Sequence, residues 1–222
     1  MKKLFSLICL FTLCAATYAQ ENLITDGKFE DASFSVSDMS RRIPGPGKWF
    51  PYLTSDKQAV MSVVKDAEKG KVASIQTLSS VSYAYSYIGQ RVAKAPAAGV
   101  YTVKFWAKAT HDTPTYFGVY LKANAGKGET LFFPLAGFHP QETPAQSGGL
   151  KQARLSNEWK EYTIDFDLSQ IVNNVAAPRI AKAEIILSKA ENNHRQTFDL
   201  GIACMTKNSG MLFTDVSMVK KN

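Results

Sequence analysis

The segment Gly99-Val-Tyr-Thr-Val-Lys-Phe-Trp-Ala-Lys108 decides the fold class of this chain, because its apolar and polar residues alternate with a period of two. Successive side chains of a β-strand point to opposite faces of a sheet. One face of this strand is therefore apolar, and we expect it to contact a core. Its residues are Tyr101, Val103, Phe105 and Ala107. The other face carries Thr and Lys side chains together with Trp106, and a large aromatic residue in that setting needs a reason.

Short segments of the same kind recur along the chain, with turn residues between them. They are residues 59–64, 71–77, 83–92, 115–122, 131–133, 158–168, 182–188, 197–205 and 211–219. About ten to twelve short strands with almost no helix predict an all-β protein. We expect a β-sandwich of two antiparallel sheets.

The first 19 residues have the features of a secretory signal peptide. Two lysines precede an apolar run that is too short to span a bilayer, and small residues end the segment at Ala19. We expect cleavage before Gln20, a single domain over residues 20–222, and export to the periplasm, the cell surface or the medium. A lipid anchor is the alternative, although neither Cys9 nor Cys14 follows the small residue that a lipoprotein site carries. No later segment is apolar enough to cross a membrane.

Charge and cysteine content narrow the classes of partner. The formal net charge is +7, or +5 once the two lysines of the signal segment are removed, and the basic residues are scattered. Scattered charge indicates a solvated surface, with a preference for anionic glycans as the alternative, and it argues against nucleic acid binding. Only Cys204 remains after cleavage, so we expect no intramolecular disulfide and a buried, unreactive thiol.

The segment 83–92 allows two orientations in a sheet. Its odd-numbered positions hold Tyr83, Tyr85, Tyr87 and Arg91, and its even-numbered positions include Ile88 and Val92. If the even positions face the core, the tyrosines form an exposed row on the outside. If the odd positions face the core, the tyrosines are interior residues with their hydroxyl groups at its edge.

A turn over residues 93–98 suggests that this segment pairs with 99–108 as an antiparallel hairpin. A symmetric hairpin places Tyr85 opposite Trp106 and Tyr87 near Lys104. A shift of one residue in that register would move every side chain to the other face.

Two loops contain further aromatic residues. The first ends Lys48-Trp49-Phe50-Pro51-Tyr52, and its prolines exclude an interior strand. Trp49 either closes one end of the sandwich or joins Tyr52 at a ligand-facing rim. The second loop, residues 134–149, contains Phe138 and His139, and loops of this length are often functional.

Three stretches taken together resemble the carbohydrate-binding modules of the galactose-binding-like jelly-roll fold, of the type appended to xylanases and glucanases. They are the opening Asn22–Glu30 (NLITDGKFE), Gln90–Val92 followed by a turn and Tyr101–Lys108, and the pair Trp159–Phe166 and Phe213–Met218. Their order matches the family, and they frame nearly the whole mature chain. The chain is also similar to a group of uncharacterised secreted bacterial proteins described as sugar-binding.

The resemblance implies a jelly roll whose two termini meet and a structural Ca²⁺ at their junction. The matching carboxylates are Glu30 and Asp215, with Asp26 as a further candidate. Ca²⁺ takes six to eight oxygen ligands. Where the family commonly has two consecutive aspartates, Thr214 replaces the first and removes one charge. The alternative role for these carboxylates is to accept hydrogen bonds from the backbone at strand ends.

The resemblance also implies a saccharide bound across a sheet or at the loop tips. Aromatic rings would stack on the C–H faces of sugars, while planar polar groups would pair with their hydroxyls. The candidates on the sheet are Trp106, Tyr85, Tyr87, Arg91 and Lys104, with Tyr116 and Tyr120 extending that surface. The candidates at the loop tips are Trp49, Tyr52, Phe138 and His139.

Signals for catalysis are weak. Asp165 and Asp167 share one face of a strand and are formal candidates for a glycosidase pair, although a solvated polar face is the favoured interpretation. His111, His139 and His194 lie in unrelated loops, and no nucleophile, zinc or phosphate-loop motif occurs. We therefore expect a poly- or oligosaccharide-binding protein without catalytic activity. The alternatives are a protein-binding or structural subunit of a surface assembly and, less favoured, a polysaccharide hydrolase or lyase.

Overall fold

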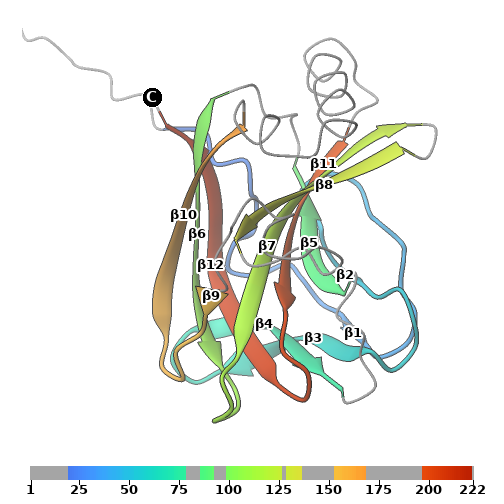
Figure 1. Ribbon diagram of the computed structural model, residues 1–222, viewed down its shortest axis with the longest axis vertical. Coiled ribbons are helices and arrows are strands. Elements are labelled where there is room, and N and C mark those ends of the chain that lie inside the picture. The colour runs from blue at the N-terminus through green and yellow to red at the C-terminus, as the bar shows by residue number, and fades with distance from the viewer. Residues whose placement is uncertain are drawn as a thin grey trace, which may run out of the picture.

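Two antiparallel sheets face one another in the computed structural model (Figure 1). The structure describes residues 20–78, 86–92, 99–126, 129–136, 153–168 and 197–221. The predicted signal segment lies outside these residues. Every strand pairing among the described residues is antiparallel, as predicted.

The first sheet contains both the segment that decided the fold class and the last strand. In spatial order its strands are β1 (Ser35–Val36), β3 (Ala59–Asp66), β4 (Gly70–Thr77), β12 (Gly210–Lys220), β6 (Val100–Ala109) and β10 (Lys160–Asp167). The strand β6 is central, between β12 and β10. A central position accounts for its strong alternation, because both of its edges are paired and its faces alone separate core from solvent.

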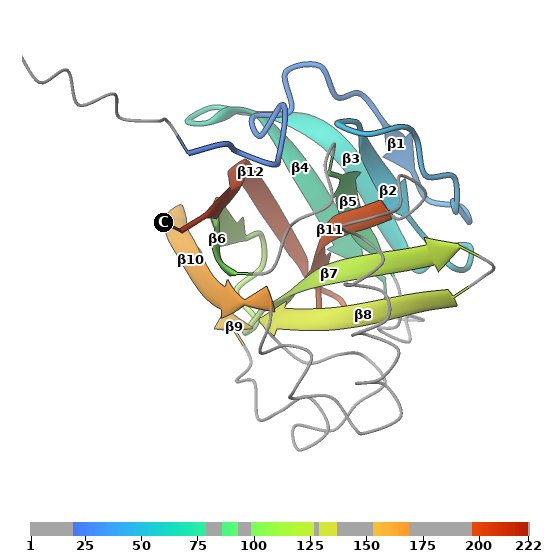
Figure 2. The same cartoon turned by 90° about the horizontal axis from the view of Figure 1, so that it is seen from above.

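The second sheet lies across the core from the first (Figure 2). Its strands are β2 (Trp49–Tyr52), β5 (Tyr87–Arg91), β11 (Thr197–Cys204), β7 (Tyr116–Gly126) and β8 (Glu129–Ala136), with β9 (Ala153–Arg154) also paired to β7. Neighbours in both sheets are mostly not consecutive in the chain, so the chain crosses repeatedly between the layers. This is the predicted jelly-roll β-sandwich.

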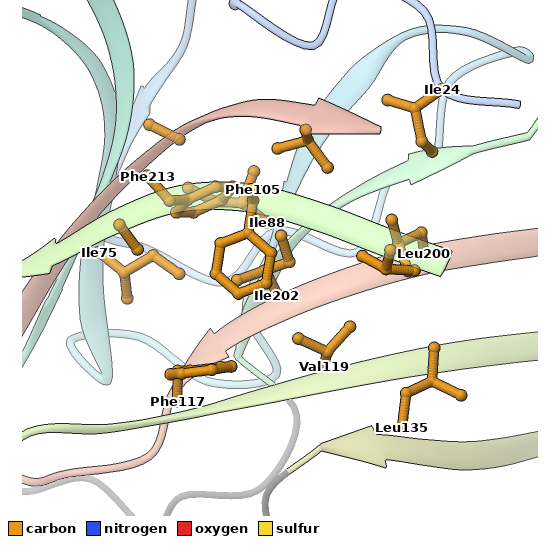
Figure 3. Close-up of a cluster of buried hydrophobic side chains, with 14 of the residues drawn as sticks. Ile24, Ile75, Ile88, Phe105, Phe117, Val119, Leu135, Leu200, Ile202 and Phe213 are labelled. Carbon is orange, nitrogen blue, oxygen red and sulfur yellow. The ribbon is translucent and has the colours of Figure 1, made fainter. Parts of the chain in front are cut away.

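The core lies between the sheets and is largely aromatic and aliphatic (Figure 3). The four apolar side chains of β6 are buried there, as the alternation predicts. Phe105 of β6 meets Phe117 of β7 edge to face, with ring centroids 5.3 Å apart, which joins the two sheets. Burying a phenylalanine side chain contributes about 1.5–3 kcal/mol, so contacts of this kind supply most of the stability.

The opening and closing segments of the described chain meet, as the resemblance implies (Figure 2). Asn22 forms an isolated antiparallel bridge with Val219, and the Val216 N–H donates to the Gly27 carbonyl at 3.0 Å. The buried amide of Gln90 fixes the same segment, because it accepts from the Thr25 N–H at 2.8 Å and donates to the Thr25 carbonyl at 2.6 Å.

The described residues include the one cysteine of the predicted mature chain. Cys204 is a buried free thiol, and burial raises its pKa to about 11, which keeps it protonated and unreactive. None of the described helices combines the length and apolar character needed to cross a membrane.

Candidate functional site

The structure divides the expected aromatic surface between the outer faces of two different sheets. The strand β5 pairs with β2 and β11, whereas β6 pairs with β12 and β10. The predicted hairpin register is therefore wrong, and Tyr87 does not lie near Lys104. Both strands turn an apolar face inward, and crossing to the opposite sheet allows both faces to bury in one core. Tyr85 lies outside the described residues.

In β5 the even-numbered positions face the core, which is the first of the two orientations considered for the segment 83–92. Ile88 and Val92 lie in the core, and Tyr87 points to the outer face of the second sheet. Tyr87 is nevertheless only 3% exposed, so the predicted exposed row is wrong for this residue.

Trp106 does point outward from the first sheet. The turn between β3 and β4 packs on its ring there. The ammonium group of Lys69, in that turn, lies 3.7 Å from the centre of the Trp106 ring. Trp159 contacts the end of β3 just before the same turn, because its indole N–H donates to Asp66 at 3.3 Å, and the Lys108 ammonium lies 4.8 Å from its ring centre. The two indoles therefore fasten the turn to the sheet and are already occupied by protein groups.

Asp66 is the electrostatic centre of this contact. Burial alone would raise its pKa, but hydrogen bonds from Lys108 and from the backbone of Glu68 and Lys69 outweigh that effect and lower the pKa to about 2. The Lys108–Asp66 ion pair is 3.0 Å long and mostly shielded from solvent. This cluster has the character of a structural contact.

We expect Trp106→Ala to lower the free energy of unfolding by about 1–2 kcal/mol, because it removes the cation–π contact with Lys69 and part of the packing of the turn. The protein should stay folded. Urea denaturation followed by circular dichroism measures the change. Unchanged stability would show that the turn does not depend on this ring.

A second group of large side chains gathers on the outer face of the second sheet. We call it the second-sheet surface, and its residues are Phe50, Tyr52, Tyr87, Arg91, Tyr120, Lys122 and Asp199. They come from β2, β5, β7 and β11, so strands far apart in the sequence supply them. Of the candidate residues predicted from the sequence, Tyr52, Tyr87 and Arg91 are brought together here.

Two glycines form the floor beneath the aromatic part of this surface. Gly89 of β5 and Gly201 of β11 are cross-strand partners. A Cβ atom added to Gly89 or Gly201 would lie 2.9 Å or 2.8 Å from the Tyr87 ring, so the ring rests directly on the backbone. Tyr52 stacks on Tyr87 with ring centroids 4.9 Å apart and planes 18° apart. Tyr52 is only half-buried, which makes it the solvent-accessible ring of the stack.

A charged row crosses the same surface next to the tyrosines. Asp199 of β11 is the cross-strand partner of Arg91 on one side and of Lys122 on the other. Arg91 donates from Nε to Oδ1 at 2.8 Å and from Nη2 to Oδ2 at 3.4 Å, and the Asp199 side chain is fully buried. Lys122 donates to the Tyr87 hydroxyl at 3.5 Å and lies 4.8 Å from the centre of the Tyr52 ring.

Burial perturbs the titration of this row. It lowers the pKa of Lys122, with the nearby Asp199 opposing and Arg91 reinforcing that shift. It also raises the pKa of Tyr87, and the charge of Asp199 adds to the effect. Perturbed titration of this kind, combining desolvation with specific charged neighbours, is more frequent at functional sites than elsewhere.

The remaining predicted site residues lie apart from this surface. Trp49 is 7% exposed in the core, where its indole N–H donates to the Asp26 carbonyl at 2.8 Å and its ring packs on Phe29. It closes the sandwich, which was the first of the two roles considered for it. Lys104 is exposed on the first sheet, 3.9 Å from Glu161. His139 and Phe138 lie outside the described residues.

Sequence reasoning missed Lys122, Asp199 and the glycine floor. The available signal was a glycine within each of two apolar strands, because glycine in a strand interior often marks close approach of another group to the backbone. Asp199 gave a second signal, as a carboxylate inside an otherwise apolar strand.

The formal glycosidase pair does not have the environment of a general acid. Asp165 is exposed and accepts hydrogen bonds from Lys221 and Thr102, both at 2.6 Å. These bonds lower its pKa, whereas a carboxyl group that protonates a leaving group needs a raised pKa.

The junction of the termini contains the residues of the expected calcium site, and several of its oxygen atoms accept hydrogen bonds from protein donors. Both carboxylate oxygens of Asp26 accept backbone N–H groups, from Glu30 at 2.6 Å and from Asp31 at 3.2 Å. The Lys71 ammonium donates to the Glu30 carbonyl at 2.5 Å, and Lys28 lies 4.0 Å from Asp215. In the part of the chain that the structure describes, no three acidic, His or Cys side chains gather as a metal site. The Asp26 carboxylate therefore has the alternative role considered for it, accepting hydrogen bonds from the backbone.

We therefore expect that neither 5 mM CaCl₂ nor 5 mM EGTA, concentrations of about the millimolar order at which weak extracellular sites fill, changes the melting temperature. Lys71→Met should lower it, because the Glu30 carbonyl loses its donor. Differential scanning fluorimetry measures both effects. Stabilisation by calcium that EGTA reverses would instead indicate a metal site at this junction.

The comparisons with known proteins agree with this fold. A family model described as "Domain of unknown function (DUF4627)" matches residues 57–218, which include most strands of both sheets. The chain belongs to the DUF4627 family. A search of curated proteins found no match to this DUF4627 chain.

Solved structures similar to this DUF4627 protein are jelly-roll sandwiches. A "putative sugar binding protein" from Bacteroides thetaiotaomicron VPI-5482 aligns with a TM-score of 0.60 at 16% identity, covering 90% of this chain and 100% of that one. The CBM22-1 xylan-binding domain of Paenibacillus barcinonensis Xyn10C aligns with a TM-score of 0.48 at 9% identity, covering 92% and 98%. At these identities the similarity concerns the fold, and it agrees with the resemblance to carbohydrate-binding modules.

Proposed function

We propose that this protein binds carbohydrate without catalysing its conversion, and that the second-sheet surface is the binding site. The observation that carries the proposal is the Tyr52–Tyr87 stack, which rests on the Gly89–Gly201 floor beside the row Arg91–Asp199–Lys122. Glycine weakens a strand interior by roughly 0.5–1 kcal/mol relative to alanine. The sheet itself does not require these two glycines. The aromatic stack requires them, because the Tyr87 ring lies where their Cβ atoms would be.

The chemistry of the surface suits a sugar ring. Sugars offer an apolar C–H face and a rim of hydroxyl groups, and binding sites combine apolar area with a few polar groups in fixed positions. Tyr52 supplies the accessible ring, and Arg91, with 19% of its side chain exposed, supplies a fixed donor. The ion pair with Asp199 holds that guanidinium in place before any ligand arrives, which reduces the entropy cost of binding.

The fold and the predicted export support the same function. The structural relative with a TM-score of 0.60 is named for sugar binding. Export by residues 1–19 would bring the protein into contact with polysaccharides outside the cytoplasm. Side chains of one sheet form the whole proposed site, so the proposal specifies neither a particular glycan nor a cofactor.

Affinity electrophoresis tests the proposal. The mature protein is run through native gels that contain galactan, xylan, arabinan, mannan, polygalacturonate, alginate or chondroitin sulfate. We expect retardation by at least one of these polymers and no release of reducing ends or unsaturated products on prolonged incubation. The absence of retardation by every polymer would contradict carbohydrate binding, and release of products would indicate an enzyme.

A further inference from the structure

We propose that a cavity at the end of the β3–β4 hairpin binds a small carboxylic acid that has an apolar chain. The cavity lies between this hairpin and residues 30–33, and its volume is about 430 Å³. Ligand cavities in proteins commonly measure about 300–1,000 Å³. The hairpin belongs to the first sheet, so the inference goes beyond the proposed function and does not depend on it.

The strand register places two lysines opposite each other in the wall of this cavity. Lys65 of β3 is the cross-strand partner of Lys71 of β4. Both lie on the core-facing side of their strands, because Val63 and Ala73, each two residues away, pack in the core. Like charges directly opposite each other destabilise a pair of strands. A negative group bound beside the two ammonium groups would relieve that repulsion.

The two lysines differ in their contacts with the protein. The Lys71 ammonium donates to the Glu30 carbonyl at 2.5 Å, which fixes it at the wall of the cavity. In the part of the chain that the structure describes, Lys65 and the hydroxyl of Ser33, which also lines the cavity, have no hydrogen-bond partner. An ammonium group has three N–H donors, so all three of Lys65 and two of Lys71 are open to a ligand.

The rest of the wall defines the class of ligand. The Glu30 side chain also lines the cavity, and its carboxylate disfavours a ligand with two negative charges. Val63 and Val64 supply apolar wall, and Val64 is 37% exposed in the free protein. Ligand sites combine apolar area with a few polar groups in fixed positions. A carboxylate with a short hydrocarbon chain therefore matches the lysines with its charge and the valines with its chain.

Titration with hexanoate, followed by proton–nitrogen correlation NMR of the mature protein, tests the site. We expect hexanoate to shift the amide signals of Val63, Lys65 and Gly70, which line the cavity. Hexanamide, which is neutral and has nearly the same shape, should bind about fivefold more weakly, as expected for one partly solvated charge contact. Sulfate at the same ionic strength should also bind more weakly, because it has two charges and no apolar chain.

Lys65→Met separates ligand binding from a structural role, because methionine keeps an unbranched chain and removes the charge. We expect it to weaken hexanoate binding about fivefold. The melting temperature of the ligand-free variant should equal or exceed that of the wild type, because the repulsion from Lys71 is lost. Lys104→Met is the control for net charge. Lys104 is exposed between two buried residues of β6, so it points away from the core, and its loss should leave hexanoate binding unchanged.

Four outcomes would overturn the inference: no shift of the cavity signals with hexanoate, equal binding of hexanamide, tighter binding of sulfate, or equal affinities of Lys65→Met and Lys104→Met. A lower melting temperature of ligand-free Lys65→Met would contradict it as well, because the lysine would then support the fold. The comparison of hexanoate with hexanamide uses the wild type and does not depend on any variant. Lys65→Met should be retarded by polysaccharide as the wild type is, so the proposed function is tested separately.

Discussion

Asp199→Ala is expected to lower the free energy of unfolding by about 3–5 kcal/mol, because it removes a fully buried carboxylate from between the cations Arg91 and Lys122. Arg91 loses the partner of two hydrogen bonds, and Lys122 loses the neighbour that favours its charged form. Chemical denaturation in guanidinium chloride measures the change, with native-like spectra as the criterion of folding.

Two further variants define the cause. Asp199→Ala combined with Lys122→Met should recover part of the lost stability, because one of the two cations beside the missing carboxylate is then gone as well. Asp165→Ala removes an exposed carboxylate that also pairs with a cation, Lys221, and should have no measurable effect. Equal stability of Asp199→Ala and Asp165→Ala would contradict the account of the charged row.

Gly27→Ala is expected to cost about 3 kcal/mol and to lower the melting temperature by roughly 6–12 °C. A Cβ atom on Gly27 would collide with the backbone carbonyl of Val216, and the same two residues share the hydrogen bond that joins the termini. The obstacle is backbone, so a change of rotamer cannot relieve it.

Gly45→Ala is the matched control, because nothing lies within 4 Å of the position of its added Cβ atom. Its melting temperature should equal that of the wild type or lie slightly above it, since alanine restricts the unfolded chain. A Gly27→Ala protein as stable as Gly45→Ala would show that the termini are not held together at this point.

The sequence was sufficient to predict the fold class because burial dominates the pattern of central strands. In β6 every second residue is apolar and every one of these residues is buried. A period of two is a local property and can be read without knowing the partner strands. The resemblance then added the order of the segments and the meeting of the termini, and both agree with the structure.

Strand partners could not be predicted in the same way. The segments around Ile88 and Phe105 each have an inward apolar face, and that pattern is the same for a hairpin and for a crossover to the opposite sheet. Only the full pairing distinguishes them, with Ile88 opposite Ile202 and Phe105 opposite Tyr162. Because the predicted hairpin paired these two segments, it placed Trp106 and Tyr87 on one surface. In the structure they lie on different sheets.

Long-range contacts explain the other differences. Lys69 covers Trp106, and Lys71 donates to Glu30 across a separation of 41 residues. Neither contact leaves a local pattern in the sequence. The sequence predicts Tyr52 and Arg91 as candidate residues, but their positions beside Lys122 and Asp199 depend on strands that are not neighbours in the chain.

The measurement that tests the central claim most directly is the affinity of Tyr52→Ala and Trp106→Ala for the most tightly bound polysaccharide of the panel. Both variants remove an aromatic ring from an outer face, one from each sheet. The account predicts at least a tenfold loss of affinity for Tyr52→Ala, which corresponds to about 1.4 kcal/mol, and wild-type affinity for Trp106→Ala. Wild-type affinity of a folded Tyr52→Ala protein, or loss of binding only in Trp106→Ala, would contradict it.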